Sequence, residues 1–203
     1  KALNNISFDI KKGWCTALIG ESGSGKSTLV KLLLRLYEIQ SGNILLDGID
    51  IRDLELRSLR SCIGWVSQDV FLFHGSVLEN ITLAPIKVQG KSADEARDSA
   101  LKLLARFDLK DKADQYPDRL SGGQQQRVAI IRSLAVNPRL LLLDEVTSAL
   151  DPVLVNEVLS IVRDLKQDGM TMVLATHEMG FATQVADEVC FLESGNILER
   201  GTA

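Results

Sequence analysis

One segment, residues 20–27, constrains the fold of this chain more than any other part of its sequence. It reads GESGSGKS and fits the pattern G-x-x-x-x-G-K-[S/T], which is typical of a loop that wraps around phosphate groups. Its glycines permit backbone conformations in which successive N–H groups point at an anion, and the positive end of a following helix points there too. An apolar run precedes it at residues 16–19, and residues 27–36 have helical spacing. The sequence therefore predicts a buried strand, a phosphate-binding loop and a helix, rather than a glycine-rich surface turn.

This loop has the residues needed to hold a nucleoside triphosphate together with Mg²⁺. Lys26 is expected to bridge the β- and γ-phosphates, and the hydroxyl of Ser27 is expected to bind Mg²⁺. The predicted phosphate contacts belong to the loop and the first helical turn, namely Gly20, Ser22, Gly23, Ser24, Gly25, Lys26, Ser27 and Thr28.

Short apolar runs alternate with amphipathic helical stretches along most of the chain. The runs lie at residues 16–19, 63–67, 140–143, 170–176 and 188–192. They are continuous rather than alternating, which is typical of a largely parallel sheet covered by helices on both faces. Residues 6–10 alternate instead, and residues 189–199 resemble a hairpin, so both predict antiparallel strands. The predicted fold class is α/β, with a mostly parallel sheet and some antiparallel β elements.

Between residues 76 and 120 the strand pattern disappears and helical spacing takes its place. Residues 94–107 have one apolar face, and residues 122–136 are a second helix candidate. We interpret residues from about 76 to 136 as a helical subdomain inserted into an α/β core, which consists of residues 1–75 and 137–203. The chain of 203 residues has the size of a single domain.

Composition and charge exclude several classes of protein. Hydrophobic residues make up 45% and charged residues 25% of the chain, which excludes an intrinsically disordered protein. The formal net charge of −4 argues against nucleic acid as a partner. The three cysteines are widely spaced, so neither a disulfide framework nor a zinc site is expected. No apolar run approaches the ~20 residues that span a bilayer and no signal peptide is recognisable, so we expect any membrane contact to come through a partner.

Two acidic residues follow the apolar run at residues 140–143. Asp144 comes at the carboxyl end of a buried strand, where an open α/β sheet places its ligands, and is expected to hold Mg²⁺. Glu145 is expected to be the general base that polarises an attacking water. By itself this pair is more typical of an acidic strand end or a helix N-cap. The phosphate-binding loop in the same chain favours the magnesium site.

The segment Leu120-Ser121-Gly122-Gly123-Gln124 carries the strongest family resemblance. A helix that starts with Ser121 and two glycines offers a second anion-binding helix end without a lysine, although a simple N-cap fits equally. With Gln125, Gln126 and Arg127 after it, the segment resembles the signature motif of ATP-binding-cassette (ABC) ATPases. Over essentially its whole length, the chain resembles an ABC nucleotide-binding domain. That resemblance implies a P-loop NTPase fold of the RecA-like type with an inserted α-helical subdomain.

The same resemblance implies roles for further residues. Gln68 matches the glutamine loop, which senses Mg²⁺ and water at the γ-phosphate, and Asp151 ends the loop that crosses the dimer interface. His177 matches the switch histidine that contacts the γ-phosphate. The implied catalytic residues are Lys26, Gln68, Glu145 and His177, the implied Mg²⁺ ligands are Ser27, Gln68 and Asp144, and the implied nucleotide contacts at the dimer interface are Ser121, Gly122, Gly123, Gln124 and Asp151.

A function and partners are also implied by the resemblance. Two nucleotide-binding domains, as a homodimer or heterodimer, would associate head-to-tail around ATP and Mg²⁺, and ATP hydrolysis would separate them. The helical subdomain would dock on a membrane-spanning transporter subunit, so the chain is expected in the cytoplasm at the inner face of the membrane. No nucleic-acid partner is expected. The alternatives are a nucleotide-binding module with little or no catalysis, a non-transport ABC ATPase and a small-molecule kinase.

The sequence departs from the family in two respects. The aromatic residue that stacks on adenine is not recognisable upstream of residue 20, so weaker nucleotide binding than the family norm is expected. Residues 42–80 resemble the exporter branch, whereas residues from 82 onward, especially 171–180, resemble the ATPases of polar amino-acid importers. A chimera, a reconstruction or a divergent natural sequence would each have this pattern. The transported substrate and the direction of transport therefore stay open.

Overall fold

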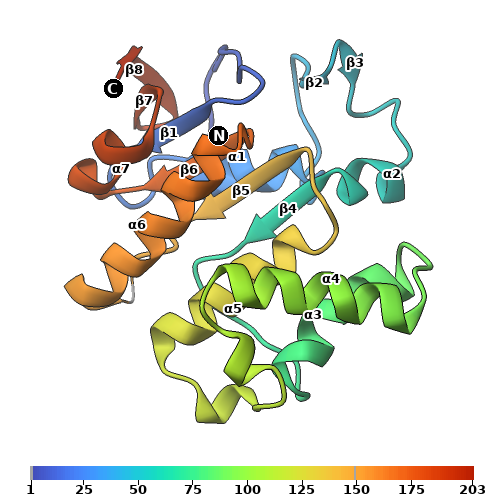
Figure 1. Ribbon diagram of the computed structural model, residues 1–203. Coiled ribbons are helices and arrows are strands. Elements are labelled where there is room, and N and C mark those ends of the chain that lie inside the picture. Colours follow the sequence, from blue (N-terminus) through green and yellow to red (C-terminus); the bar gives the residue numbers. More distant parts are fainter. Residues whose placement is uncertain (1, 149) are drawn as a thin grey trace.

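A computed structural model describes residues 2–148 and 150–203, with a six-stranded sheet at its centre (Figure 1). In their order across the sheet, the strands are β4 (Ile63–Val66), β5 (Leu140–Asp144), β6 (Met172–Thr176), β1 (Cys15–Ile19), β7 (Glu188–Glu193) and β8 (Asn196–Thr202). The first five run parallel, and β8 pairs antiparallel with β7. The predicted α/β fold, with a mostly parallel sheet and a hairpin of the last two strands, is confirmed.

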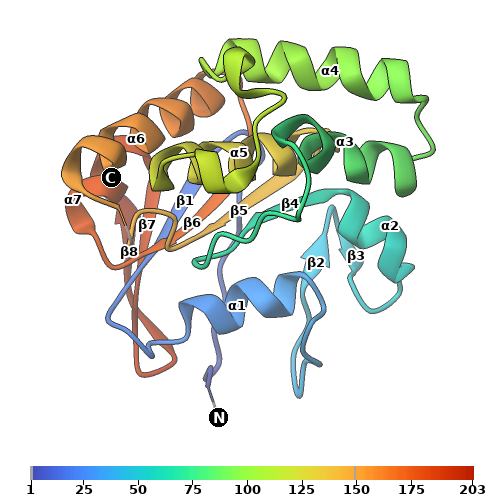
Figure 2. The ribbon, with the colours of Figure 1, turned by 90° about the horizontal axis from the view of Figure 1, so that it is seen from below.

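Helices cover both faces of this sheet (Figure 2). Helix α1 (Lys26–Leu33) lies on one face, and helices α5 (Gly122–Leu134), α6 (Pro152–Gln167) and α7 (Met179–Val185) lie on the other. Helices α1 and α5 are the two that helical spacing predicts after the phosphate-binding loop and after Ser121. Each ends two or three residues earlier than the spacing suggests.

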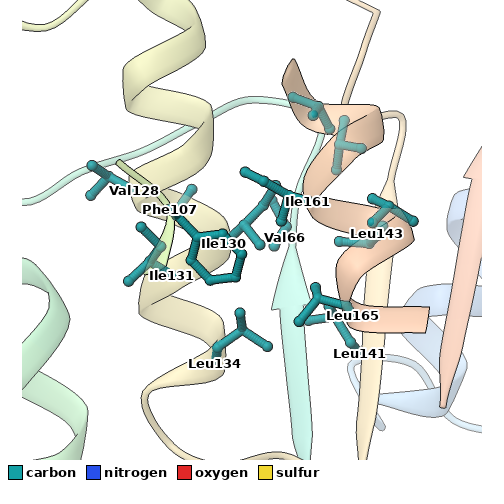
Figure 3. Close-up of a cluster of buried hydrophobic side chains, with 14 of the residues drawn as sticks. Val66, Phe107, Val128, Ile130, Ile131, Leu134, Leu141, Leu143, Ile161 and Leu165 are labelled. Atoms are coloured by element: carbon teal, nitrogen blue, oxygen red, sulfur yellow. The ribbon is translucent and has the colours of Figure 1, made fainter. Parts of the chain in front are cut away.

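Strand β5 shows why the apolar runs are continuous. Leu141 and Leu143 belong to the hydrophobic cluster on the side of α5 and α6, whereas Leu140 and Leu142 belong to the cluster on the side of α1. Successive side chains of a strand point to opposite faces, so a strand buried on both faces has no polar position. Figure 3 shows Leu141 and Leu143 packed with side chains from α5 and α6.

The chain between β4 and β5 is helical. Helix α3 (Val77–Lys87), helix α4 (Ala93–Arg106) and two short 3-10 helices at residues 110–112 and 117–119 precede α5. Both α3 and α4 begin with a capping box, in which a serine and a glutamate three residues later exchange hydrogen bonds with the backbone. The helix predicted from residue 94 is therefore confirmed as α4. Of the helices in the described residues, none is both long and apolar enough to span a bilayer.

Two segments differ from the sequence-based expectation. The predicted strand at residues 6–10 is wrong: its alternating apolar side chains pack on the α1 side of the sheet, but this segment forms no strand. Alternation of apolar residues indicates that one side of a segment is buried. It does not show that the segment is hydrogen-bonded to a neighbouring strand. A hairpin of β2 (Leu45–Leu46) and β3 (Ile49–Asp50), followed by α2 (Leu56–Ser61), is a structure that the apolar pattern does not predict.

Candidate functional site

Three parallel strands bring most of the predicted site residues to one edge of the sheet. Strand β6 lies between β1 and β5, with Ile19 beside Thr176 and Asp144 beside Ala175. The segments that follow these strands therefore start next to one another. They are the phosphate-binding loop after β1, the acidic pair at the end of β5 and the histidine after β6. In an open α/β sheet, this carboxyl edge is where ligands bind.

The phosphate-binding loop turns sharply into helix α1. Gly25 is the N-cap residue and has a φ of 112°, a left-handed conformation that favours glycine. The unpaired N–H groups at the start of α1 therefore face the loop. The hydroxyl of Ser24 is buried and has no hydrogen-bond partner among the described residues. Such a hydroxyl is costly to bury, so the loop suits a polar ligand that supplies the missing partner.

Lys26 is almost fully buried at the floor of this loop. Its exposed fraction is 3%, and its ammonium donates hydrogen bonds to the carbonyl oxygens of Gly20 and Glu21 at 2.7 and 3.0 Å. The same nitrogen lies 3.4 Å from Oε1 of Glu145. These partners compensate the hydration that a buried ammonium loses. A phosphate that enters the loop would compete with Glu145 for this cation.

Ser27 and Asp144, two of the predicted Mg²⁺ ligands, contact each other directly. The Ser27 hydroxyl donates to Oδ1 of Asp144 at 3.0 Å. Burial raises the pKa of the Asp144 carboxyl above its ordinary value, and the Ser27 hydrogen bond opposes that shift. A carboxylate that is costly to ionise gains from a nearby cation, so the pair fits a hard divalent ion. In the part of the chain that the structure describes, no three His, Cys, Asp or Glu side chains gather into a metal site by themselves.

Glu145 connects Lys26 to His177. Its Oε1 faces Lys26, and its Oε2 lies 3.3 Å from Nδ1 of His177. The side chain of His177 is 50% exposed, so the pair is accessible to a water molecule or a phosphate. Glu145 has a φ of 49°, and its N–H donates to the carbonyl of Ala175 at 2.8 Å. A left-handed non-glycine residue costs about 1–3 kcal/mol, and such residues cluster at functional sites.

Gln68 and Asp151 lie outside this network of hydrogen bonds and ion pairs. Gln68 is exposed two residues after β4, and Asp151 caps helix α6 by accepting from the N–H groups of Val153 and Leu154. Among residues 2–148 and 150–203, no hydrogen bond or ion pair joins the side chain of Gln68 or Asp151 to the residues around Glu145. The predicted residues that the structure brings together by direct contacts are Lys26, Ser27, Asp144, Glu145 and His177.

Ser121 lies at the exposed start of helix α5. Its hydroxyl oxygen accepts from the N–H of Gln124 at 3.3 Å, and Oε1 of Gln124 accepts from the N–H of Ser121 at 3.0 Å. The N-cap alternative therefore describes its local geometry. That bond uses the hydroxyl as an acceptor and leaves its hydrogen for another partner. Ser121 and Gly122 are exposed, so a second molecule can reach the start of the helix, whereas Gly123 is buried.

Two features of this structure are absent from the sequence analysis. The Thr147 hydroxyl donates to Oε1 of Glu178 at 2.9 Å, which links the loops that follow β5 and β6. A cleft of about 760 Å³ is lined by residues of α2, β4, α3 and α5, among them Trp65 and Arg132, and by Phe73 from the segment between β4 and α3. Each feature joins segments that are distant along the chain, so no short motif or periodic pattern marks it.

A phosphate-binding loop, an acidic pair two strands away and an exposed Ser-Gly-Gly helix start together define a P-loop ATPase of the cassette type. Residues 3–148 match the protein family described as ABC transporter. The glutamine transport ATP-binding protein GlnQ of Escherichia coli (strain K12) is 47% identical over 204 residues, which cover 99% of this chain and 85% of that protein. The glutamate/aspartate import ATP-binding protein GltL of the same strain is 48% identical, with 98% and 84% covered. This chain therefore belongs to the ABC transporter family and is an ABC-type ATPase.

Solved structures agree with this assignment. The structure of cbiO1 from Clostridium perfringens, part of the ABC transporter complex cbiONQ, has a TM-score of 0.92 at 32% identity and covers 99% of this chain and 82% of that one. The cassette MJ0796, as a dimer in a post-hydrolysis state bound to ADP and Pi, has a TM-score of 0.87 at 34% identity, with 99% and 90% covered. The predicted fold and family are confirmed. The exporter-like resemblance of residues 42–80 stays a prediction.

Proposed function

We propose that this chain binds and hydrolyses ATP to power the import of a polar amino acid through a membrane-spanning partner. The observation that carries the proposal is the chain of contacts from Lys26 through Glu145 to His177, beside the contact of Ser27 with Asp144. The names of the relatives, glutamine transport and glutamate/aspartate import, support the class of transported substrate.

In this proposal residues 20–28 bind the triphosphate. Lys26 contacts the β- and γ-phosphates, and the loop N–H groups and the Ser24 hydroxyl donate to phosphate oxygens. Ser27, Asp144 and Gln68 would hold Mg²⁺, which would neutralise charge on the phosphates. Before ATP binds, Glu145 balances the positive charge of Lys26. An arriving phosphate takes over that role.

Once a phosphate pairs with Lys26, the Glu145 carboxylate is free to take part in hydrolysis. Glu145 acts as the general base and accepts the proton of the attacking water. His177, which lies against Oε2 of Glu145, contacts the γ-phosphate, and Gln68 orients the water. Catalysis rests on positioning and on charge stabilisation.

A second nucleotide-binding domain completes the site from the opposite side. Ser121, Gly122, Gly123 and Gln124 of one copy face the γ-phosphate bound to the other, and Asp151 lies on the loop between them. The exposed start of α5 supports this arrangement, because N–H groups and a hydroxyl at a helix N-terminus attract an anion. ATP then holds the two domains together, and hydrolysis removes the contact and lets them separate.

We place the docking site for the membrane-spanning subunit in the cleft lined by α2, β4, α3 and α5, which is partly built from the helical subdomain. Trp65 and Phe73 are 37% and 46% exposed there, and the guanidinium of Arg132 lies 5.6 Å from the centre of the Phe73 ring. Exposed aromatic and arginine side chains are enriched at protein interfaces, and a cleft of about 760 Å³ has room for a short helix of the partner. Such docking holds the chain at the inner, cytoplasmic face of the membrane.

The substitution Glu145→Gln tests the catalytic part of this proposal. We expect ATP turnover to fall by about 10²- to 10⁴-fold, the usual contribution of a general base. In sedimentation experiments with ATP, the variant should accumulate as a dimer. Glu193→Gln, which changes an exposed glutamate at the end of β7, is the matched control and should behave as wild type. Wild-type turnover that rises steeply with protein concentration supports the head-to-tail dimer.

Two outcomes of this experiment contradict the proposal. Undiminished hydrolysis by Glu145→Gln removes Glu145 from the mechanism. A wild-type chain without turnover at any concentration favours the alternative of a nucleotide-binding module that does no catalysis.

A further inference from the structure

Two loops meet beside the proposed catalytic residues, one after β5, of which the structure describes residues 145–148, 150 and 151, and one after β6. One contact between them is that of Glu145 with His177, which belongs to the proposed mechanism. The other is the hydrogen bond from the Thr147 hydroxyl to Oε1 of Glu178, at 2.9 Å. Neither residue of this second contact takes part in the proposed chemistry, so its presence calls for another reason.

Thr147 is fixed inside the protein. Its exposed fraction is only 2%, although it carries a polar hydroxyl. A buried hydroxyl is costly without a partner, and a hydrogen bond to a carboxylate is one of the stronger kinds. The N–H of Leu150 also donates to the carbonyl of Thr147, at 3.0 Å. Thr147 therefore bonds to Glu178 through its side chain and to Leu150 through its backbone.

Glu178 is fixed to the end of strand β6. Its N–H donates to Oγ1 of Thr176, at 3.0 Å, and Thr176 is 1% exposed as the last residue of the strand. Glu178 is also the N-cap residue of α7, but its side chain makes no hydrogen bond to the N–H groups of that helix. Its carboxylate thus bonds to the neighbouring loop through Thr147 instead of capping its own helix.

The loop that receives this bond has a strained residue at its start. Glu145 is left-handed, with a φ of 49°, and its carbonyl accepts from the Ser148 hydroxyl at 2.9 Å. A non-glycine residue keeps such a conformation only where its surroundings hold it. Thr147 lies two residues after Glu145 and four before Asp151, so a bond at this point restrains both.

We propose that Thr147 and Glu178 form a positioning pair, whose hydrogen bond holds residues 145–148 against the end of β6 and keeps the Glu145 carboxylate in place beside His177. The pair rests on the proposed function, in which Glu145 takes a proton from water. It touches no nucleotide in that scheme. Its loss should therefore lower kcat and leave the KM for ATP nearly unchanged, because the phosphate-binding loop stays intact.

Matched substitutions in the full chain separate the hydrogen bond from packing. Thr147→Val keeps the shape and removes the hydroxyl, whereas Thr147→Ser keeps the hydroxyl. Glu178→Ala removes the acceptor, whereas Glu178→Gln keeps an acceptor oxygen. Thr183→Val, which removes a hydroxyl bonded within α7, is the control. We expect Thr147→Val and Glu178→Ala to lower kcat about tenfold, with KM within about twofold, and the other three to stay near wild type.

The double variant shows whether the two residues act together. If they do, Thr147→Val combined with Glu178→Ala should be no slower than the slower single variant, because both remove the same bond. Independent losses that multiply would overturn the pair, and so would a Thr147→Val variant with wild-type kcat.

Amide hydrogen exchange of the nucleotide-free chain gives a readout that does not depend on turnover. Peptides that cover residues 145–151 should exchange faster in Thr147→Val than in Thr147→Ser, since the variant lacks the side-chain hydrogen bond that joins this segment to Glu178 at the end of β6. Equal exchange in the two variants would overturn the pair. A wild-type chain that hydrolyses no ATP would refute the proposed function instead, and the exchange experiment would still decide on the pair.

Discussion

At the scale of single residues, Ser24 has the environment that most clearly calls for a ligand. We expect Ser24→Ala to leave the unfolding free energy of the nucleotide-free protein unchanged or slightly higher, because the buried hydroxyl has no partner to lose among the described residues. ATP affinity should fall by about two- to tenfold, which corresponds to one hydrogen bond of about 0.5–1.5 kcal/mol.

Thermal unfolding and an ATP titration measure these two effects of Ser24→Ala separately. Ser99→Ala, at an exposed position of α4, is the control. A Ser24→Ala variant that loses stability but keeps full affinity would contradict a role in binding.

The three cysteines should differ strongly in reactivity. Burial raises the pKa of Cys15 to about 12 and that of Cys190 to about 11, whereas Cys62 is half-buried. The thiolate is the reactive form, so iodoacetamide at pH 8 should label Cys62 first and the other two only on unfolding. Mass spectrometry of the peptides checks this order. Equal labelling of all three in the folded chain would contradict it.

The same pKa shifts predict how stability depends on pH. The folded chain holds the Cys15 and Cys190 protons more tightly than the unfolded chain, in which the thiol pKa is 9.0. The unfolding free energy should therefore decrease as the pH rises above 9.0. Cys15→Ala should reduce that decrease, which urea unfolding at pH 8 and pH 10 measures. An equal decrease in the variant and the wild type would contradict this assignment.

At the scale of secondary structure, the buried strands are the elements that the sequence predicts best. A strand with two covered faces leaves a continuous apolar run, as at β5 and β6. Residues 6–10 mislead because their alternation reflects burial on one side only. For the hairpin of β2 and β3, the usable signal is the dipeptide Asp47-Gly48, whose φ angles of 50° and 82° are typical of a tight hairpin turn.

The turn between β7 and β8 supports the phosphate-binding loop. The N–H of Gly195 donates to the carbonyl of Ser24 at 3.1 Å, and a Cβ at Gly195 would lie 2.5 Å from the carbonyl oxygen of Ala2. We expect Gly195→Ala to weaken ATP binding several-fold, because relief of that clash moves the turn away from the loop.

Gly169→Ala is the matched control for this substitution. Its φ of 75° is close to the 78° of Gly195, but nothing lies within 4 Å of its added Cβ. Both variants should lose about 1–3 kcal/mol of stability from a left-handed alanine, with a further loss in Gly195→Ala from the clash, and only Gly195→Ala should change the ATP dissociation constant. Equal dissociation constants for the two variants would show that the turn does not support the loop.

At the scale of the whole molecule, the sequence identifies site residues more readily than the contacts between them. Lys26 and Asp144 lie in short motifs after apolar runs, and each can be named from its neighbours. Their approach depends on β6 lying between β1 and β5, and that strand order is a property of the complete sheet. The bond from Thr147 to Glu178 and the cleft at Trp65 need the same long-range arrangement.

Assembly should make the stability of the chain depend on both ATP and protein concentration. A ligand at 100 times its dissociation constant adds about 2.7 kcal/mol to the unfolding free energy. For Glu145→Gln with ATP and Mg²⁺, the thermal midpoint should also rise with protein concentration, because the dimer unfolds only after it separates. Without ATP, or with EDTA, this dependence should vanish. A midpoint that is independent of concentration in the presence of ATP and Mg²⁺ would contradict an ATP-driven dimer.

Helix α5 connects two surfaces with different proposed partners. Its capping residue Ser121 is exposed at one end, and Arg132 and Ser133 near the other end line the cleft. Helix α5 has 13 residues and is therefore about 20 Å long. Because a helix of this length is stiff, a tilt at the Ser121 end would also move the residues that line the cleft, and α5 would couple the two proposed partners mechanically.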